Sequence, residues 1–250
     1  MRNFKSINFA INAFFCSLIL TLFFACSSDA EYQQPSVHSN TQIAQVYRIA
    51  AYPDNLDNPY EISGQLFSEI AEEYLDQEFN PDSTQIIINR VQSIANSNLT
   101  YYSLLPYNYE TPNSSVIDSI LAIKNPAQYN IDQTSILSSQ AELKLKNFLD
   151  TLSVFNGNKT EVEVIITYIF SYESLIIADI TFNQKEKEIL LTTSSIVRHA
   201  FFFAKRKPKK NKDKDWDISW GNMYAAAHGS KDSTAKAIIV ALVAMLIVNN

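Results

Sequence analysis

Apolar residues recur at helical spacing along much of the chain between residues 58 and 206. The best-defined stripe consists of Leu137, Ala141, Leu145, Phe148, Leu152 and Phe155, at intervals of three and four. A second stripe consists of Val162, Ile165, Ile169, Tyr172, Ile176 and Ile180. Earlier segments, near residues 62–79 and 82–95, and a later one through residue 204 repeat the pattern. Such spacing places the apolar side chains on one face of a helix, where they can be buried in a common core.

Helix boundary signals accompany these stripes. Asn-Pro pairs at residues 58–59, 80–81 and 125–126 can each open a helix, because asparagine caps a helix and proline suits its first position. A capping-box pattern begins at Thr160, and Asn183 with Glu186 can cap a further helix. We therefore predict an all-α fold, a helical bundle of about five to seven helices after an extended N-terminal tether.

One segment leaves an alternative open. Residues 161–181 are rich in Ile, Val, Thr, Tyr and Phe, which favour strands, so an edge strand is possible there. Their length without a turn signal favours a helix. Only four glycines occur in the chain, few for a protein with tight hairpins.

The N-terminus has the layout of an export signal. Arg2 and Lys5 precede an apolar run from Ile7 to Ala25, and no acidic residue occurs before Asp29. The sequence Leu22-Phe23-Phe24-Ala25-Cys26 resembles the signal box of bacterial lipoproteins. That resemblance implies cleavage before Cys26 and lipidation of its thiol, with palmitate-type acyl chains. An ordinary cleaved signal and an uncleaved membrane anchor are the alternatives.

Cysteine usage favours lipidation. Cys16 would be removed with the signal, so Cys26 would be the sole cysteine of a mature chain of 225 residues. A single leftover cysteine in an exported protein needs an explanation, and lipidation supplies one.

The expected organisation has five parts. Residues 1–25 are the lipoprotein signal peptide, 26–57 a flexible tether, and 58–206 the helical domain. Residues 207–215 form a basic linker. Residues 216–250 form a C-terminal segment, rich in small and apolar residues, that packs on the bundle as helix. Its 12-residue apolar run, 237–248, would span about 18 Å as a helix, too short to cross a bilayer alone.

Charge is distributed unevenly along the chain. Residues 26–197 hold 22 acidic and 8 basic residues, whereas residues 198–214 hold 8 basic residues and one acidic residue. In an exported protein such a basic run is expected to meet anionic lipid head groups or the acidic body of the protein itself, and not nucleic acid. A hydrated linker is the alternative. The candidate head-group contacts are Lys205, Arg206, Lys207, Lys209 and Lys210.

No sequence motif for catalysis, cofactor binding or metal binding is recognisable. The four glycines lie too far apart for phosphate or dinucleotide loops. His38, His199 and His228 form no ligand pair at metal-site spacing, so we predict no metal and no cofactor. The acids Glu69, Glu72, Glu73 and Asp76 share a helix face and are expected to form a solvated ridge.

The Tyr-rich stretch from residue 101 to residue 109 is the best candidate binding surface. It contains Tyr101, Tyr102, Tyr107 and Tyr109, whose rings could stack on sugars or form an interface. They could equally close one end of the bundle.

These features favour a lipid-anchored envelope protein, placed at the outer membrane of a Gram-negative bacterium. Its expected role is a non-enzymatic interaction or structural module, with another envelope protein as a possible partner. One alternative is a membrane-active protein whose C-terminal apolar segment inserts or self-associates. The other is an enzyme with a site built from scattered residues, for which His199 is the named candidate.

Overall fold

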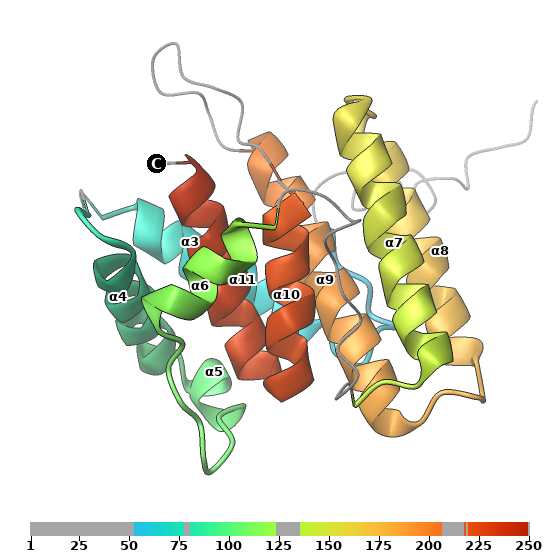
Figure 1. Cartoon of the computed structure of the whole chain (residues 1–250), viewed down its shortest axis with the longest axis horizontal. Helices are drawn as coiled ribbons and strands as arrows, with labels where there is room; N and C mark the ends of the chain where they lie inside the picture. Colours follow the sequence, from blue (N-terminus) through green and yellow to red (C-terminus); the bar gives the residue numbers. More distant parts are fainter. Residues whose placement is uncertain (1–52, 78–80, 124–135, 207–217, 219, 250) are drawn as a thin grey trace, which may run out of the picture. The chain divides into compact units, whose positions relative to one another are not determined.

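The computed structural model describes residues 53–77, 81–123, 136–206, 218 and 220–249. The chain divides into two units, Met1–Ile43 and Ala44–Asn250, and every described residue belongs to the second. The described residues form nine α-helices and no strand, which confirms the all-α prediction with more helices than expected (Figure 1). The helices are α3 Ile62–Leu75, α4 Thr84–Ser97, α5 Leu99–Ser103, α6 Ser114–Leu121, α7 Ser139–Gly157, α8 Val162–Ala178, α9 Gln184–Arg206, α10 Trp220–Asp232 and α11 Thr234–Asn249.

Polar side chains cap some of the helix starts but not all of them. Asn98, Asn113 and Ser138 cap α5, α6 and α7 through their side-chain oxygens. Asn183 and Glu186 cap each other's backbone N–H groups at the start of α9, at 3.0 and 2.9 Å, as predicted. The capping box expected at Thr160 is absent, because α8 begins after Glu161 without a side-chain cap.

Asn58, expected to open a helix, caps none. Its Oδ1 accepts the N–H of Tyr60 in a turn that precedes α3. The other two Asn-Pro pairs include residues outside the described part of the chain.

The strand-prone segment is a helix, α8. Its buried residues Ile165, Ile169, Tyr172 and Ile176 keep helical spacing. The hydroxyls of Thr167, Ser171 and Ser174 donate to backbone carbonyls four residues earlier. Burial of one apolar face therefore outweighs the strand preference of individual residues.

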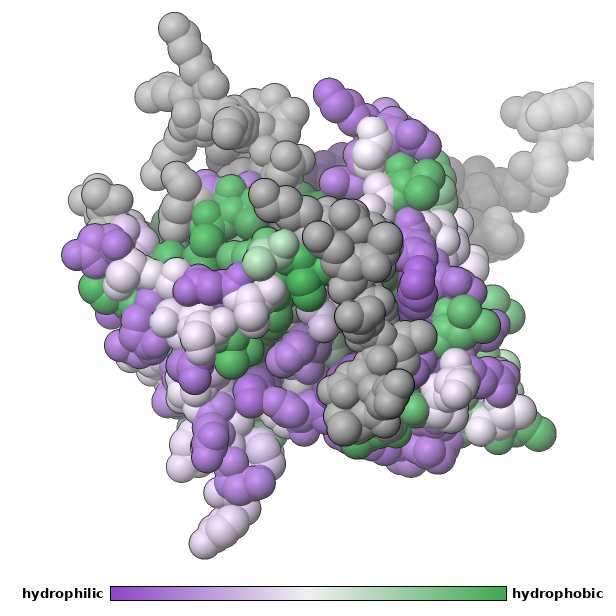
Figure 2. Space-filling model, viewed as in Figure 1, coloured by the Kyte–Doolittle hydropathy of each residue, from purple (hydrophilic) through white to green (hydrophobic). Residues whose placement is uncertain are grey.

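The core is organised around α9 and α11. Residues 189–203 of α9 are all buried, and so are Ala235 and residues 237–246 of α11. Helix α11 packs most extensively on α10 and also contacts α3, α4, α6 and α9. A helix that is apolar on every side needs neighbours on every side, and these helices supply them. The surface drawn in Figure 2 mixes hydrophilic and hydrophobic residues.

Helices α10 and α11 approach each other closely where their hairpin begins. A Cβ atom at Gly229 would lie 2.6 Å from the Cα of Ala237, so only glycine fits there without movement. Among the described residues, none of the helices combines the length and hydropathy needed to cross a membrane.

The folded part begins earlier than the sequence suggested. Residues 53–57 were expected to end the tether, yet Pro53 is buried and Asn55 bonds to Glu173 of α8 at 2.7 Å. The basic linker at 207–215 and the signal at 1–25 lie outside the described residues.

Burial of α11 predicts that a charge on its inner face destabilises the fold. Val243 is fully buried, whereas Val248, on the same helix, is 41% exposed. We expect Val243→Asp to lower the free energy of unfolding by about 3–5 kcal/mol, because the carboxylate has no partner there. Val248→Asp is the matched control and should change it little. Urea unfolding followed by circular dichroism measures both, and equal small effects would contradict a buried α11.

Candidate functional site

A cluster of buried polar side chains is centred on Arg198 in α9. Its side chain is fully buried, and its guanidinium lies over the Phe170 ring at 5.1 Å. Both terminal nitrogens of Arg198 donate to Glu61, which directly precedes α3, with the NH1–Oε1 distance 3.1 Å. Arg198 also donates to Glu173 of α8 at 3.1 Å and to the carbonyl of Pro53. One cation thus links α3, α8, α9 and the segment before α3.

Glu173 gathers the remaining polar groups of this cluster. It accepts hydrogen bonds from Asn55 Nδ2 at 2.7 Å, from Asn58 Nδ2 at 3.0 Å and from Ser194 Oγ at 2.9 Å. These bonds satisfy a carboxylate that is completely buried. A buried carboxylate with several donors and an arginine partner is a stable arrangement, and it fixes the chain at residues 55–58.

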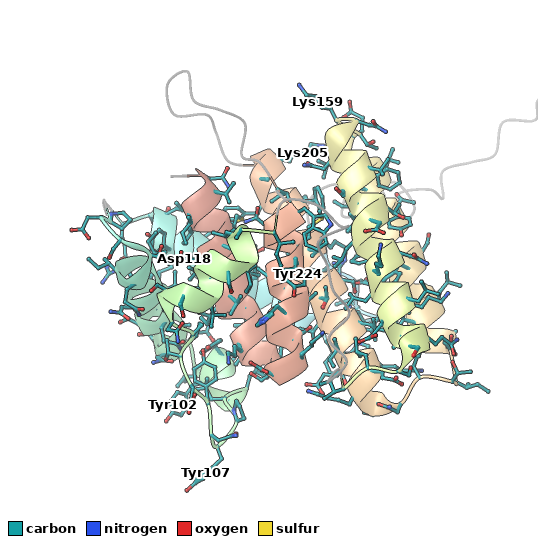
Figure 3. The ribbon with its side chains drawn as sticks, in the orientation of Figure 1. Tyr102, Tyr107, Asp118, Lys159, Lys205 and Tyr224 are labelled. Atoms are coloured by element: carbon teal, nitrogen blue, oxygen red, sulfur yellow. The ribbon has the colours of Figure 1, made fainter. Side chains whose placement is uncertain are left out.

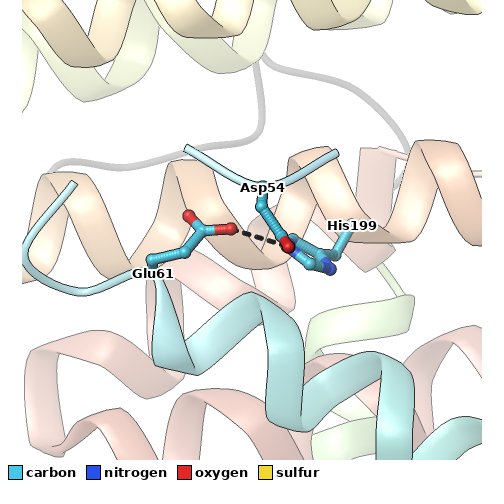
Figure 4. Close-up of side chains that lie close together, drawn as sticks. All are labelled: Asp54, Glu61 and His199. Carbon is cyan, nitrogen blue, oxygen red and sulfur yellow. Dashed lines mark hydrogen bonds and ion pairs between the residues drawn. The ribbon is translucent and has the colours of Figure 1, made fainter. Parts of the chain in front are cut away.

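His199 lies beside this ion pair, next to Arg198 on α9. Its Nε2 is 2.8 Å from Glu61 Oε1 and 3.5 Å from Asp54 Oδ1 (Figure 4). Its Nδ1 is 3.0 Å from Ser68 Oγ, one and a half helical turns into α3. His199 is 3% exposed, whereas Asp54 retains 34% of its side-chain exposure. The cluster therefore reaches solvent on the side of Asp54.

A close contact of α3 with α9 holds the imidazole in place. A Cβ atom at Gly64 would lie 2.2 Å from His199 Cδ2 and 2.5 Å from Ser195 Oγ. Ser195 also bonds to Glu61 at 3.2 Å. Glycine at residue 64 is thus required for the two helices to approach this closely.

The neighbouring charges set the protonation of the cluster. Burial raises the pKa of Glu61, but the hydrogen bonds and charges of His199 and Arg198 lower it overall. Burial lowers the pKa of Arg198, and the charges of Glu173 and Glu61 outweigh it, so that pKa is raised. Glu61 and Arg198 are therefore both ionised at neutral pH.

Ser68, His199 and Glu61 form a hydroxyl–imidazole–carboxylate series, an order that nucleophilic enzymes also use. Ser68 lies in the middle of α3, where backbone N–H groups are held by carbonyls four residues earlier. Those donors cannot stabilise an oxyanion as acyl transfer requires. The series is better suited to orient an imidazole than to activate a serine.

The second candidate site is an open groove along α4. It is lined by five amide side chains, Gln85, Asn89, Gln92, Asn96 and Asn113, together with hydroxyl residues, and has a volume of about 610 Å³. No charged residue lines it, and Pro112 is its one apolar residue among those described. Four of the amides follow one face of α4 at intervals of four, three and four residues.

The amides of the groove are held in place by one another. Gln85 donates to Asn89 at 3.0 Å, and Gln92 donates to Asn96 at 2.8 Å. Gln85 also accepts the backbone N–H of Ser114, which joins α6 to the groove. Hydrogen-bonded amides are pre-oriented and lose less freedom when a ligand binds.

The structure separates the four tyrosines proposed as a binding surface. Tyr101 is fully buried, and its hydroxyl lies 3.1 Å from that of Tyr109, which donates to Gln92 at 2.7 Å. Tyr101 therefore offers no contact surface, because its ring fills the core. Burial, with the neighbouring Tyr101, raises the pKa of Tyr109 well above its usual value. Tyr102 and Tyr107 are exposed, and Tyr107 points away from the helices (Figure 3).

Of the five basic residues proposed to contact head groups, the structure describes the side chain of Lys205. It pairs with Glu163 of α8, and both side chains are largely exposed. The side chains of Arg206, Lys207, Lys209 and Lys210, and the lipidation site Cys26, lie outside the described part. The ridge of Glu69, Glu72, Glu73 and Asp76 is exposed along α3, as expected for solvated acids.

Sequence reasoning missed most of the charged cluster. Asp54 was assigned to the tether, and neither Glu61, Glu173 nor Arg198 was singled out. Glu173 follows Ile169 by four residues, which places an acidic side chain on the apolar face of α8. That position in the sequence indicates a buried polar group that needs a partner. The amide series on α4 was another signal in the sequence, since its spacing places all four amides on one face.

Comparison of the chain with family models, with curated proteins and with solved structures finds no match in any of the three.

The lowered pKa of Glu61 predicts a loss of stability in acid. Its contribution is fully present above the unfolded value of 4.5 and is lost as the pH falls through the lower pKa of the folded state. We expect the free energy of unfolding to fall more steeply between pH 6 and about pH 3 in the native protein than in Glu61→Gln. Glu72→Gln, at an exposed acid of α3, is the control and should keep the native slope. Parallel urea titrations measure the slopes, and identical slopes for the native protein and Glu61→Gln would contradict this role.

Proposed function

We propose that the protein is a lipid-anchored module of the cell envelope that binds an uncharged, hydroxyl-rich ligand in the groove along α4. The class of ligand is a neutral glycan, and binding involves no catalysis. The observation that carries the proposal is the groove itself, an open surface lined by five side-chain amides and, within the described part of the chain, by no charged residue.

The lining of the groove supports an uncharged ligand. A charged ligand would lose hydration on entering without gaining a counter-charge. An apolar ligand would find polar walls and the single ring of Pro112. Each side-chain amide offers both donor and acceptor groups, and a sugar hydroxyl likewise donates and accepts. Two neighbouring hydroxyls of a sugar can therefore pair with one amide.

The hydrogen bonds already present favour this pairing. The acceptors of Asn89 and Asn96 are used by Gln85 and Gln92. Their amide N–H groups remain, within the described residues, as donors for ligand oxygens. The volume of about 610 Å³ is in the range of small-molecule and short-oligosaccharide sites.

The anchor part of the proposal rests on the signal at Leu22 to Cys26, which would place the groove near the glycans of an envelope. A mass spectrum of the N-terminal peptide checks it, with a lipid-modified Cys26 as the expected first residue. A peptide that continues unmodified through Ala25 would contradict lipidation.

Burial of α11 weighs against the membrane-active alternative. Insertion of this helix would remove the apolar surface on which α3, α4, α9 and α10 pack. Its 16 residues span about 24 Å as a helix, less than the roughly 30 Å of a hydrocarbon core. The exposed tyrosines and the uneven charge along the chain would also allow the protein to bind a protein partner in the same envelope.

Binding to a panel of oligosaccharides tests the function. We expect neutral hexose or N-acetylhexosamine oligosaccharides to bind, and sulfated or uronic-acid counterparts to bind more weakly. Asn89→Ala and Asn96→Ala should each weaken binding about 2- to 10-fold, because each removes a hydrogen bond worth about 0.5–1.5 kcal/mol. Isothermal titration calorimetry of the full chain in detergent measures the change.

The matched control is Gln140→Ala, which removes an exposed amide on α7 outside the groove. It should leave the affinity unchanged. Equal losses from Gln140→Ala and Asn96→Ala, or tightest binding by the charged oligosaccharides, would contradict a neutral-glycan groove.

A further inference from the structure

Three side chains at the solvent edge of the buried cluster have the chemistry and spacing of metal ligands. One oxygen of Asp54, one oxygen of Glu61 and one ring nitrogen of His199 all lie within 4.8 Å of one another (Figure 4). We propose that these residues bind a single divalent transition-metal ion. This site is separate from the glycan groove and does not depend on it.

The distances agree with a common metal. Metal–nitrogen and metal–oxygen bonds of zinc are about 2.0–2.2 Å, which places adjacent ligands of a tetrahedral site about 3.3 Å apart. His199 Nε2 lies 2.8 Å from Glu61 Oε1 and 3.5 Å from Asp54 Oδ1. Small side-chain movements would therefore admit the ion between the imidazole and the two carboxylates.

Hydrogen bonds behind the ligands orient them. A ligating histidine normally donates its other N–H to a fixed acceptor, and Ser68 Oγ is 3.0 Å from His199 Nδ1. In the tautomer that carries its proton on Nδ1, His199 donates to Ser68 and leaves Nε2 free to bind the ion.

Glu61 is supported in the same way. Arg198 and Ser195 donate to it, and they can keep these bonds while one lone pair of Oε1 turns to the ion. A ligating carboxylate held by further donors is typical of metal sites. Arg198 therefore positions Glu61 and does not block it.

The charge of the cluster favours a divalent cation. Three acidic side chains, Asp54, Glu61 and Glu173, lie in the cluster with one arginine, Arg198. The acidic side chains of the cluster therefore outnumber its one arginine, and Asp54 stands at the solvent edge, where a divalent cation could pair with it and with Glu61.

The ligand set identifies the class of ion. Two carboxylate oxygens and one imidazole nitrogen suit zinc and neighbouring first-row ions better than calcium, which takes oxygen ligands alone. Three protein ligands leave one tetrahedral position open, on the side where Asp54 is 34% exposed. Water would complete the shell there.

Titration with zinc tests the proposal. The full chain, purified in detergent and treated with a chelator, should bind one Zn²⁺ per chain by isothermal titration calorimetry. Asp54→Asn should weaken binding at least 10-fold, because it replaces a carboxylate ligand by an amide. The side chain of Asp54 is exposed, so the substitution should leave the fold intact. Ser68→Ala should weaken it about 10- to 100-fold by releasing the imidazole. The same titration with Co²⁺ should give the visible absorption of a tetrahedral ion, and Asp54→Asn should lose it.

Two controls separate this site from chance binding. Asp57→Asn removes the same charge from an exposed neighbour outside the cluster, and His38→Ala removes another imidazole. Both should bind zinc like the native chain. Absence of one-to-one binding, unchanged affinity in Asp54→Asn, or an equal loss in either control would overturn the proposal.

Discussion

The ion pairs of Arg198 are the interaction on which the arrangement of the rest depends. A buried guanidinium is costly unless anions meet it, and Glu61 and Glu173 meet it from two other parts of the chain. Satisfying these charges fixes α8 and the start of α3 against α9. It also draws residues 53–58 onto the helices, because their amides and one carbonyl complete the hydrogen bonding. The position of Asp54 beside His199 follows from that constraint.

The apolar core holds the other helices in place. Helix α11 offers an apolar surface in every direction, and α3, α4, α9 and α10 use it. Its contact with α4 fixes the helix that carries the amide groove, while the ionic cluster lies on the other elements around α9. Two chemically different surfaces are thus held by one core. The uncharged groove faces solvent, and the charged cluster is buried except at Asp54.

Much of the fold could be predicted from the sequence, since apolar spacing and helix caps are local signals. The cap of Asn183 with Glu186 and most of the α7 and α8 stripes were predicted and are present, but Ile180 lies beyond the end of α8 and is exposed. The cluster could not be predicted in the same way. Glu61, Glu173 and Arg198 are far apart in the chain, and only tertiary packing reveals that they meet. The same reason applies to residues 53–57, which the sequence placed in the tether. They are polar, and the residues to which they bond are far away along the chain.

The central claim is that Arg198 holds these elements together through two buried carboxylates. Arg198→Met keeps an unbranched side chain of similar reach and removes the cation, and Lys205→Met does the same at the exposed end of α9. Urea unfolding of the two variants at pH 7 measures the difference directly. We expect Arg198→Met to lower the free energy of unfolding by about 3–5 kcal/mol, because two carboxylates lose their counter-charge, and Lys205→Met to change it little. A loss of less than about 1 kcal/mol in Arg198→Met, no larger than that of an exposed pair, would contradict the account.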